Sequence, residues 1–170
     1  MAAALTLPYP FDIEALTAAH DRRSFSCGVE ALDQYLKRYA RQHADTNVSR
    51  TFVAVNGPVV WGYYSLAMSG IRRDNLTERH AKRFPNFPLP VARLARLAVD
   101  LKVQRQGLGE LLLADALRRC LEISESIGMI GVLVDAKDER ASDWYLRYEF
   151  ERLPDAPLML WLPTAAIARM

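Results

Sequence analysis

The sequence predicts a mixed domain, α/β or α+β in class, built around one β-sheet, and three kinds of pattern predict it. Two segments carry apolar residues at three- and four-residue spacing, which is typical of amphipathic helices. Other segments are short runs of β-branched and aromatic residues, which are typical of strands. Asn56-Gly57 marks a tight hairpin turn, because both central positions of a type I′ turn need a positive φ. In chain order we expect a helix at 29–44, strands at 50–55, 59–68 and 91–99, a helix at 107–126, a strand at 129–134, a short helix at 139–147 and a last strand at 157–162.

The first helix follows a lead-in that we expect to be irregular, because Pro8 and Pro10 break any helix there. Arg38 and Arg41 fall outside the apolar face of the helix. That face is expected to consist of Leu32, Tyr35, Leu36, Tyr39 and His43.

The second half of the chain contains the other long helix, which Gly128 is placed to end. The segment 129–134 is nearly all apolar, as expected for a strand covered on both faces. Before it, residues 70–90 form a polar, proline-punctuated loop with a short helix near 76–84. Long loops on compact domains are often functional. A solvated, variable insertion is the alternative.

Length and composition indicate a single globular domain at 1–170, since 51% of the residues are hydrophobic and 25% are charged. No apolar run approaches the ~20 residues that a membrane helix needs. The first ten residues have neither the basic nor the long apolar part of a secretory signal. Cys27 and Cys120 have no metal-type spacing and are expected to be free thiols in a reducing compartment. We therefore expect a cytoplasmic protein without a metal.

The net charge is only +2, but eighteen of the 22 basic residues are arginines. Arginine suits bidentate contacts with phosphate, which points to RNA or a phosphorylated cofactor. The codon usage of a GC-rich genome explains the same bias equally well. A direct DNA-binding role is the least favoured, because the net charge is small and no DNA-reading motif is present.

The segment Val99-Asp-Leu-Lys-Val-Gln104-Arg-Gln-Gly107-Leu-Gly109 carries the chemistry: a strand ends, a short turn follows and a helix begins with two glycines. The first N–H groups of a helix lack internal partners, and the helix dipole adds positive charge there. Glycines let a pyrophosphate approach the backbone, and Arg105 adds a formal charge. The alternative to an anion site is a helix start at which the two glycines only allow close packing. Neither a Walker loop nor the three-glycine dinucleotide fingerprint is present.

Gln104-x-x-Gly107-x-Gly109 resembles the Q/R-x-x-G-x-G/A signature of the GNAT acetyltransferases, and the preceding strand and following helix fit as well. The resemblance implies a mostly antiparallel mixed sheet, flanked by helices and splayed at the acetyl-CoA site. It implies that the turn binds the pyrophosphate of acetyl-CoA, while Leu97 and Val99 bond the pantetheine arm through their backbone. The cofactor-binding residues expected on this basis are Leu97, Ala98, Val99, Gln104, Arg105, Gln106, Gly107, Leu108, Gly109 and Glu110.

A second resemblance lies in Asp143-Trp144-Tyr145-Leu-Arg-Tyr148-Glu149-Phe150, which is similar to the family's F-Y-x-x-x-G-F element. The tyrosine of that element closes on the thioester sulfur, so the resemblance makes Tyr145 the catalytic general acid. A phenol stays protonated at neutral pH and can protonate the leaving thiolate. Glu149 replaces the usual glycine, which leaves open how far Tyr145 lies from the sulfur. A core role is the alternative, and it is favoured for Trp144 and Phe150.

The segment Phe25-Ser-Cys-Gly-Val-Glu-Ala-Leu-Asp-Gln-Tyr-Leu36 resembles the opening of one GNAT branch, the TacT-like toxins of bacterial toxin–antitoxin pairs. The resemblance covers roughly 25–162 and implies acetylation of the α-amine of aminoacyl-tRNA, a block of translation, a homodimer and an antitoxin with a ribbon–helix–helix module. The basic residues expected to meet tRNA phosphates are Arg72, Arg73, Lys82, Arg83, Arg93 and Arg96, with Arg22 and Arg23 as further candidates. For each of them a solvated surface role is the alternative.

No general base is recognisable, and His20, His43 and His80 receive no catalytic role. A site without a base suits an α-amine of pKa about 7.7–8.0 better than a lysine of pKa about 10.4. An ordinary GNAT that acetylates a small amine or a protein N-terminus is one alternative. A non-catalytic, CoA-binding regulatory module is another.

Overall fold

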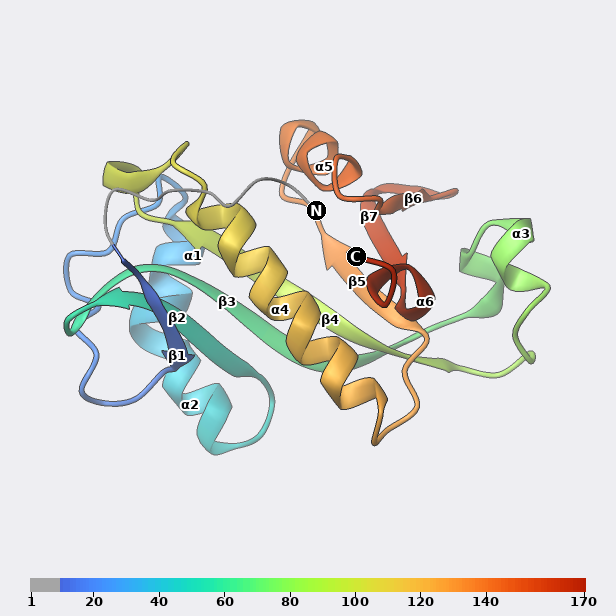
Figure 1. Ribbon diagram of the computed structural model, residues 1–170, viewed down its shortest axis with the longest axis horizontal. Coiled ribbons are helices and arrows are strands. Elements are labelled where there is room, and N and C mark those ends of the chain that lie inside the picture. The colour runs from blue at the N-terminus through green and yellow to red at the C-terminus, as the bar shows by residue number, and fades with distance from the viewer. Residues whose placement is uncertain (1–9) are drawn as a thin grey trace. The chain divides into compact units, whose positions relative to one another are not determined.

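The computed structural model describes residues 10–170, which form a seven-stranded sheet flanked by helices (Figure 1). The strand order is β1-β2-β3-β4-β5-β7-β6. The strands are β1 (Asp12–Ala15), β2 (Arg50–Asn56), β3 (Val59–Ile71), β4 (Leu89–Val99), β5 (Gly131–Asp135), β6 (Glu151–Leu153) and β7 (Ala156–Pro163). The helices are α1 (Glu30–Gln34), α2 (Ala40–Asp45), α3 (Glu78–Ala81), α4 (Leu108–Ser124), α5 (Glu139–Leu146) and α6 (Thr164–Ile167). The mixed α/β class is thereby confirmed.

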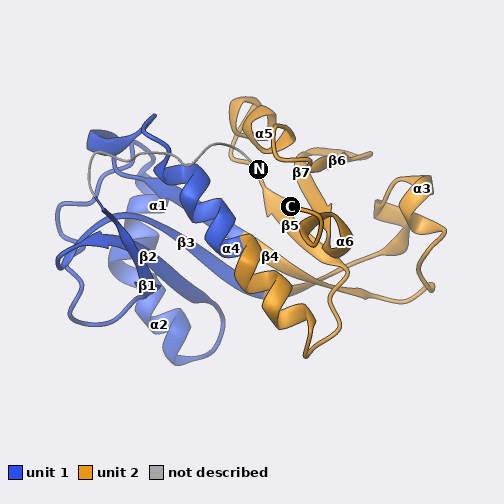
Figure 2. Ribbon diagram, viewed as in Figure 1, with its two compact units in different colours: residues 1–67, 95–116 blue, residues 68–94, 117–170 orange. Residues whose placement is uncertain are grey.

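The chain divides into two compact units (Figure 2). Unit 1 consists of residues 1–67 and 95–116, and unit 2 of residues 68–94 and 117–170. The expectation of a single domain stays a prediction. Within residues 10–170, no helix combines the length and the apolar character that crossing a membrane requires.

In unit 1, β1, β2 and β3 pair antiparallel, with Asn56 opposite Val59. The hairpin lies where the sequence predicts it, but its central residues are Gly57, with a φ of 68°, and Pro58, whose ring fixes a negative φ. The expected type I′ turn centred on Asn56-Gly57 is therefore wrong.

The prediction of an irregular lead-in is wrong for residues 12–15, because Asp12–Ala15 pairs with β2 as an edge strand. Residues 1–9, with Pro8, lie outside the part of the chain that the structure describes. Below the strands, α1 and α2 contribute to one apolar cluster, whose members include Phe25, Tyr35, Leu36, Ala40, Val53, Val60, Tyr63 and Ala98.

The predicted first helix is interrupted by a π-helical turn at Tyr35–Tyr39, which joins α1 to α2. A π turn accommodates an extra residue and so shifts the face that the following turns present. Tyr35 and Ala40 are therefore both buried, whereas Tyr39 is 47% exposed. The expected place of Tyr39 on the apolar face is wrong for this reason.

The first turns of α4 lie close to β3 because of Gly62. A Cβ atom at this position would meet Leu112 Cδ1 at 2.9 Å and the carbonyl oxygen of Ala98 at 3.2 Å. Ala98 belongs to β4 and Leu112 to α4, so Gly62 allows the strand-turn-helix segment to pack on its neighbour. A larger residue at position 62 would push the first turns of α4 away from β3.

In unit 2, residues Val91–Leu94 of β4 pair parallel with β5, and β7 pairs antiparallel with both β5 and β6. β6 and α6 were not predicted, because each has only three or four residues. The loop predicted at 70–90 is shorter, since β3 extends to Ile71 and β4 begins at Leu89. Leu76 and Phe84 of this loop pack into a cluster that contains Trp161.

Candidate active site

The turn after β4 has the geometry of an anion-binding concavity. The side chain of Asp100 accepts a hydrogen bond from Lys102 N at 2.9 Å and caps a 3₁₀ turn at Leu101–Val103. Arg105 and Gly107 then adopt positive φ values of 63° and 92°. A left-handed residue followed by the right-handed residues of a helix directs successive N–H groups to one side, which suits an anion.

The start of α4 completes this concavity. The first internal hydrogen bond of the helix runs from Leu111 N to Gly107 O at 3.1 Å. The N–H groups of Leu108 and Gly109 precede this bond and belong to the end where the helix dipole is positive. The side chain of Arg105 is exposed beside them. The residues present are compatible with a pyrophosphate group, and the expectation that they bind one stays a prediction.

The side chain of Gln104 stabilises the turn itself. Its Nε2 donates to the carbonyl oxygen of Val99 at 2.8 Å and to that of Cys27 at 3.0 Å. An amide nitrogen has two hydrogens, so these two bonds use both. The expectation that Gln104 contacts the pyrophosphate stays a prediction, and only its backbone N–H is available to donate to it.

The loop before α1 supports the same turn. Ser26 N donates to Asp100 Oδ2 at 3.1 Å, and Leu101 N donates to Ser26 O at 2.8 Å. Cys27 N donates to the buried Asp33 at 2.8 Å, which fixes the loop to α1. Asp33 and Asp100 are functional candidates that sequence reasoning missed, because no spacing pattern links residue 26 to residue 100.

Three residues at the end of β4 were expected to meet the pantetheine arm. Ala98 is buried, whereas Leu97 and Val99 are half-buried. The neighbouring Asp100 N donates to Trp61 O at 2.9 Å, which holds the end of β4 beside β3. The carbonyl of Val99 already accepts from Gln104.

Tyr145 lies near the C-terminal end of α5, whose N-terminus Asp138 caps by accepting from Ala141 N at 2.8 Å. The Tyr145 ring is 7% exposed and packs edge-on against Trp144 and Phe150. Burial raises the pKa of its phenol above the usual value of 10.0. The hydroxyl is therefore protonated throughout the neutral pH range.

Glu149, which stands where the family pattern has glycine, follows α5 with a φ of 68°. This is the left-handed region that glycine adopts freely and other residues adopt at a cost. The backbone thus keeps the conformation of a glycine turn. The structure explains in this way how the chain departs from the pattern without losing the turn.

Several of the predicted tRNA-contacting arginines have partners within the protein. The guanidinium of Arg96 lies 3.5 Å from the centre of the Tyr35 ring, a cation–π contact. The guanidinium of Arg93 pairs with Asp135, and that of Arg72 lies 3.7 Å from Asp74. Lys82 and Arg83 are exposed, and Arg73 is half-buried.

Two further arginine candidates, Arg22 and Arg23, line one open hollow of unit 1 with a volume of about 530 Å³. Arg22 donates to the carbonyl oxygen of Leu36 at 2.8 Å, and Arg23 pairs with Asp21 at 3.2 Å. Lys37 also lines this hollow, so three of its side chains are cationic. Its charge is compatible with a phosphate-bearing ligand.

Comparison with known proteins places these features in a family context. The model of the acetyltransferase (GNAT) domain matches residues 26–158. A tRNA-acetylating toxin of Mycobacterium tuberculosis is 39% identical over 147 residues, which are 86% of this chain and 88% of the relative.

Two solved structures are similar over almost the whole chain. AtaT complexed with acetyl-methionyl-tRNAfMet has a TM-score of 0.89 and 30% identity, and the match covers 94% of this chain and 98% of that one. A tyrosine-to-phenylalanine mutant of AtaT bound to the C-terminus of the antitoxin AtaR and acetyl-CoA has a TM-score of 0.81 and 30% identity, covering 95% and 97% of the two chains.

Proposed function

We propose that the chain, which belongs to the GNAT acetyltransferase family, is a toxin that transfers acetyl from acetyl-CoA to the α-amine of aminoacyl-tRNA. The observation that carries the tRNA substrate is the 39% identity, over 86% of this chain, to a tRNA-acetylating toxin. An acetylated aminoacyl-tRNA cannot act as an acceptor amine in peptide-bond formation. The consequence is a block of translation in the cytoplasm.

The turn from Gln104 to Gly109 is proposed to hold the pyrophosphate of acetyl-CoA through backbone N–H groups, with Arg105 adding charge. Leu97 and Val99 are proposed to bond the pantetheine arm through their backbone, with Ala98 between them. The bound cofactor supplies the acetyl group as a thioester. Glu110, in the first turn of α4, responds to the helix dipole.

Tyr145 is proposed as the general acid. A phenol with an ordinary pKa of about 10 is already protonated at neutral pH, so the hydroxyl presents a donor to the departing thiolate. The surrounding rings of Trp144 and Phe150 exclude water from the phenol. A phenylalanine at this position would preserve the packing and remove only the donor.

The α-amine is proposed as the acceptor because none of the three histidines is assigned as a general base. His20 bonds Glu14 at 2.6 Å, His43 bonds the Tyr35 hydroxyl at 3.2 Å, and His80 bonds Glu151 at 3.0 Å. Each imidazole is thus engaged with a protein partner. An α-amine of pKa about 7.7–8.0 is already partly neutral and has little need of a base.

The basic residues are proposed to contact tRNA phosphates, a sequence-independent interaction that suits a site which has only to hold the 3′ end. The exposed Lys82 and Arg83 are the first candidates, and Arg93 and Arg96 lie within β4, the strand that ends at the proposed cofactor site. We further propose a homodimer and neutralisation by an antitoxin with a ribbon–helix–helix module. Size-exclusion chromatography with light scattering tests the dimer, and co-purification with the product of a neighbouring short gene tests the antitoxin.

The decisive experiment is transfer of radiolabelled acetyl from acetyl-CoA to total charged tRNA, with wild type beside Tyr145→Phe. Deacylated tRNA and a polyamine mixture are the controls. Label on charged tRNA alone, with transfer slowed by about 10²- to 10⁴-fold in the variant, supports both the substrate and the acid. Label on polyamines indicates an ordinary small-amine GNAT, and CoA binding without any transfer indicates a regulatory module.

A further inference from the structure

Helix α5, which carries Tyr145, has eight residues and therefore depends on its neighbours for its position. Isolated helices shorter than about 12 residues are marginal in water. The cap at Asp138 fixes the first turn, but it does not determine how the helix is rotated about its axis. Contacts with adjacent strands must determine that rotation.

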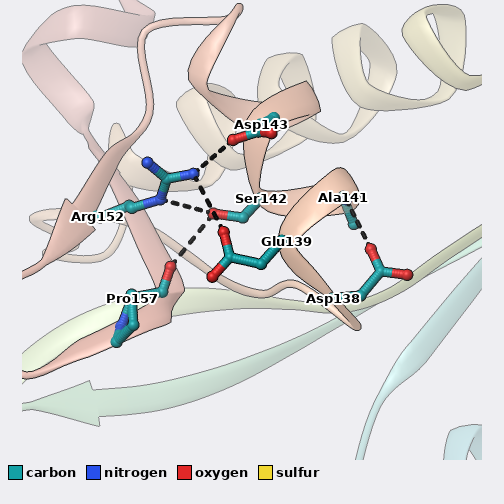
Figure 3. Close-up of polar contacts among 7 residues, drawn as sticks. All are labelled: Asp138, Glu139, Ala141, Ser142, Asp143, Arg152 and Pro157. Carbon is teal, nitrogen blue, oxygen red and sulfur yellow. Dashed lines mark hydrogen bonds and ion pairs between the residues drawn. The ribbon is translucent and has the colours of Figure 1, made fainter.

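Arg152 of β6 supplies such contacts (Figure 3). Its Nε donates to Ser142 Oγ at 2.9 Å, and its terminal nitrogen donates to Asp143 Oδ1 at 2.6 Å. The same nitrogen lies 3.9 Å from Glu139. One planar guanidinium thus contacts three residues of the same helix.

Ser142 extends this contact to a second strand. Its hydroxyl donates to the carbonyl oxygen of Pro157 in β7 at 3.2 Å while it accepts from Arg152. Ser142 is fully buried, at 0% exposure, so no water replaces either bond. Asp143 and Glu139 have side chains that are 70% and 78% exposed, and their ion pairs contribute little. The bond to Ser142 is therefore the specific part of the cluster.

Ser142 and Tyr145 are three positions apart and lie on the same face of α5. Both are buried, whereas Asp143 and Leu146 beside them are exposed. A rotation of α5 that broke the two bonds of Ser142 would also displace the Tyr145 ring. The position of the phenol therefore depends on Arg152, although the structure records no bond between them.

We propose that Arg152 is a positioning residue for acetyl transfer, which holds Ser142 and thereby sets the placement of the Tyr145 hydroxyl. This inference rests on the proposed function, in which Tyr145 protonates the leaving thiolate. Arg152 needs no contact with substrate in this role. Its effect passes through α5 alone.

Two substitutions distinguish a positioning role of Arg152 from an effect of its charge and from an effect on general stability. Arg152→Lys keeps the charge but loses the planar fork that reaches Ser142 and Asp143 together. Ser142→Ala removes the hydroxyl from a helix that tolerates alanine well. The matched control is Arg118→Lys, because Arg118 forms an exposed pair with Glu122 within α4, at 2.7 Å.

The first readout uses the full chain without substrates, labelled with 3-fluorotyrosine at position 145. We expect the ¹⁹F resonance to shift or broaden in Arg152→Lys and in Ser142→Ala, and to stay in place in Arg118→Lys. An unchanged resonance in both α5 variants would overturn the proposal. This readout does not depend on which substrate the enzyme uses.

The second readout is a double-mutant cycle in acetyl transfer to charged tRNA. We expect Arg152→Lys to lower kcat by about 10- to 100-fold, as a displaced catalytic group does, with the KM for acetyl-CoA within about twofold. In the Tyr145→Phe background the same substitution should change kcat by less than about twofold, because the two residues act as one unit. Fully additive losses would contradict the proposal and indicate a merely structural arginine.

Failure of the proposed function is visible separately. If wild type labels no charged tRNA, the substrate is wrong. If Tyr145→Phe is fully active, the acid is wrong. In either case the ¹⁹F signal still reports whether Arg152 places the ring, so the two failures are not confused.

Discussion

Gln104 and Cys27, which are 77 positions apart in the sequence, are joined by a hydrogen bond of 3.0 Å from the side-chain amide to the backbone carbonyl. The same nitrogen donates to Val99 O at 2.8 Å. The turn at the start of α4 is thereby linked both to the end of β4 and to the loop before α1. The Phe25–Gly28 segment and the glycine turn are one structural assembly, although they are separate motifs in the sequence.

Replacing Gln104 with alanine should weaken acetyl-CoA binding. The turn would lose two hydrogen bonds, each with a net contribution of about 1 kcal/mol, and would have to be ordered when the cofactor binds. We expect the Kd for CoA to rise roughly 5- to 30-fold, measured by isothermal titration calorimetry. Gln42→Ala, at an exposed position of α2 outside the proposed site, is the control and should change the Kd by less than about twofold. Equal effects at both positions would contradict the role of the Gln104 amide.

Gly107→Ala should abolish tight CoA binding, because Gly107 has a φ of 92° and belongs to the turn that we propose holds the pyrophosphate. An alanine in this conformation costs about 1–2 kcal/mol, and its methyl group adds bulk to the backbone of the proposed pyrophosphate site. We expect affinity to fall at least ~30-fold. Gly57→Ala provides the comparison: its φ is 68°, and a Cβ there has nothing within 4 Å. That variant should lose stability and keep its CoA affinity.

Glu149→Gly should stabilise the protein, an unusual direction for a substitution to glycine. A φ of 68° costs Glu149 conformational free energy, whereas glycine adopts this φ freely. After the greater entropy of the unfolded chain is subtracted, we expect a gain of about 0.5–1 kcal/mol in urea unfolding. Glu122→Gly, within α4, should lose about 1 kcal/mol. A loss at both positions would show that Glu149 makes contacts that outweigh its backbone strain.

Cys120 should make the protein less stable at alkaline pH. Burial raises the pKa of its thiol from 9.0 to about 12. Below pH 9 the thiol is protonated in both states. Above it the unfolded chain loses the proton first, so the free energy of unfolding falls by about 1.4 kcal/mol per pH unit.

The Cys120→Ala variant tests this effect by urea unfolding between pH 8 and 10. A cavity lowers its stability equally at every pH, so only the slope reports the thiol. We expect a shallower decline from pH 9 upward than in wild type. If the free energies of unfolding of the two proteins decline in parallel with pH, the effect does not come from the Cys120 thiol. The buried Tyr63 and Tyr145, whose pKa values burial also raises, contribute mainly above pH 10 in both proteins.

The long elements could be predicted because their patterns are local. The apolar stripe of α4 and the β-branched run of β2 each contain their own signal, and the observed ends differ from the expected ones by no more than two residues. Asp12–Ala15 has no such signal. It is a strand only because β2 presents a row of hydrogen-bonding groups to it. Pairing of this kind cannot be recognised in four residues of which only one, Ile13, is β-branched.

The candidate site likewise has one part with a local sequence signal and one part without it. The turn from Gln104 to Gly109 is contiguous, so its glycines and its place before a helix identified it. The support from Asp100 to Ser26 and from Arg152 to Ser142 joins distant or differently folded segments, and these contacts arise only from the tertiary structure. Sequence therefore identified the groups expected to meet ligands better than the groups that hold them in place.

The π-helical turn at Tyr35–Tyr39 lies between two buried anchors. Tyr35 stacks on Tyr63 and bonds Ser49 at 2.6 Å, while Ala40 is 0% exposed. When a helix has one additional residue between two buried residues, the additional residue is accommodated by a wider π-helical turn. In this helix the side chain that is placed in solvent as a result is that of Tyr39. Insertion and deletion of one residue at this place can therefore alter the outer surface of the helix while the sheet beneath keeps its register.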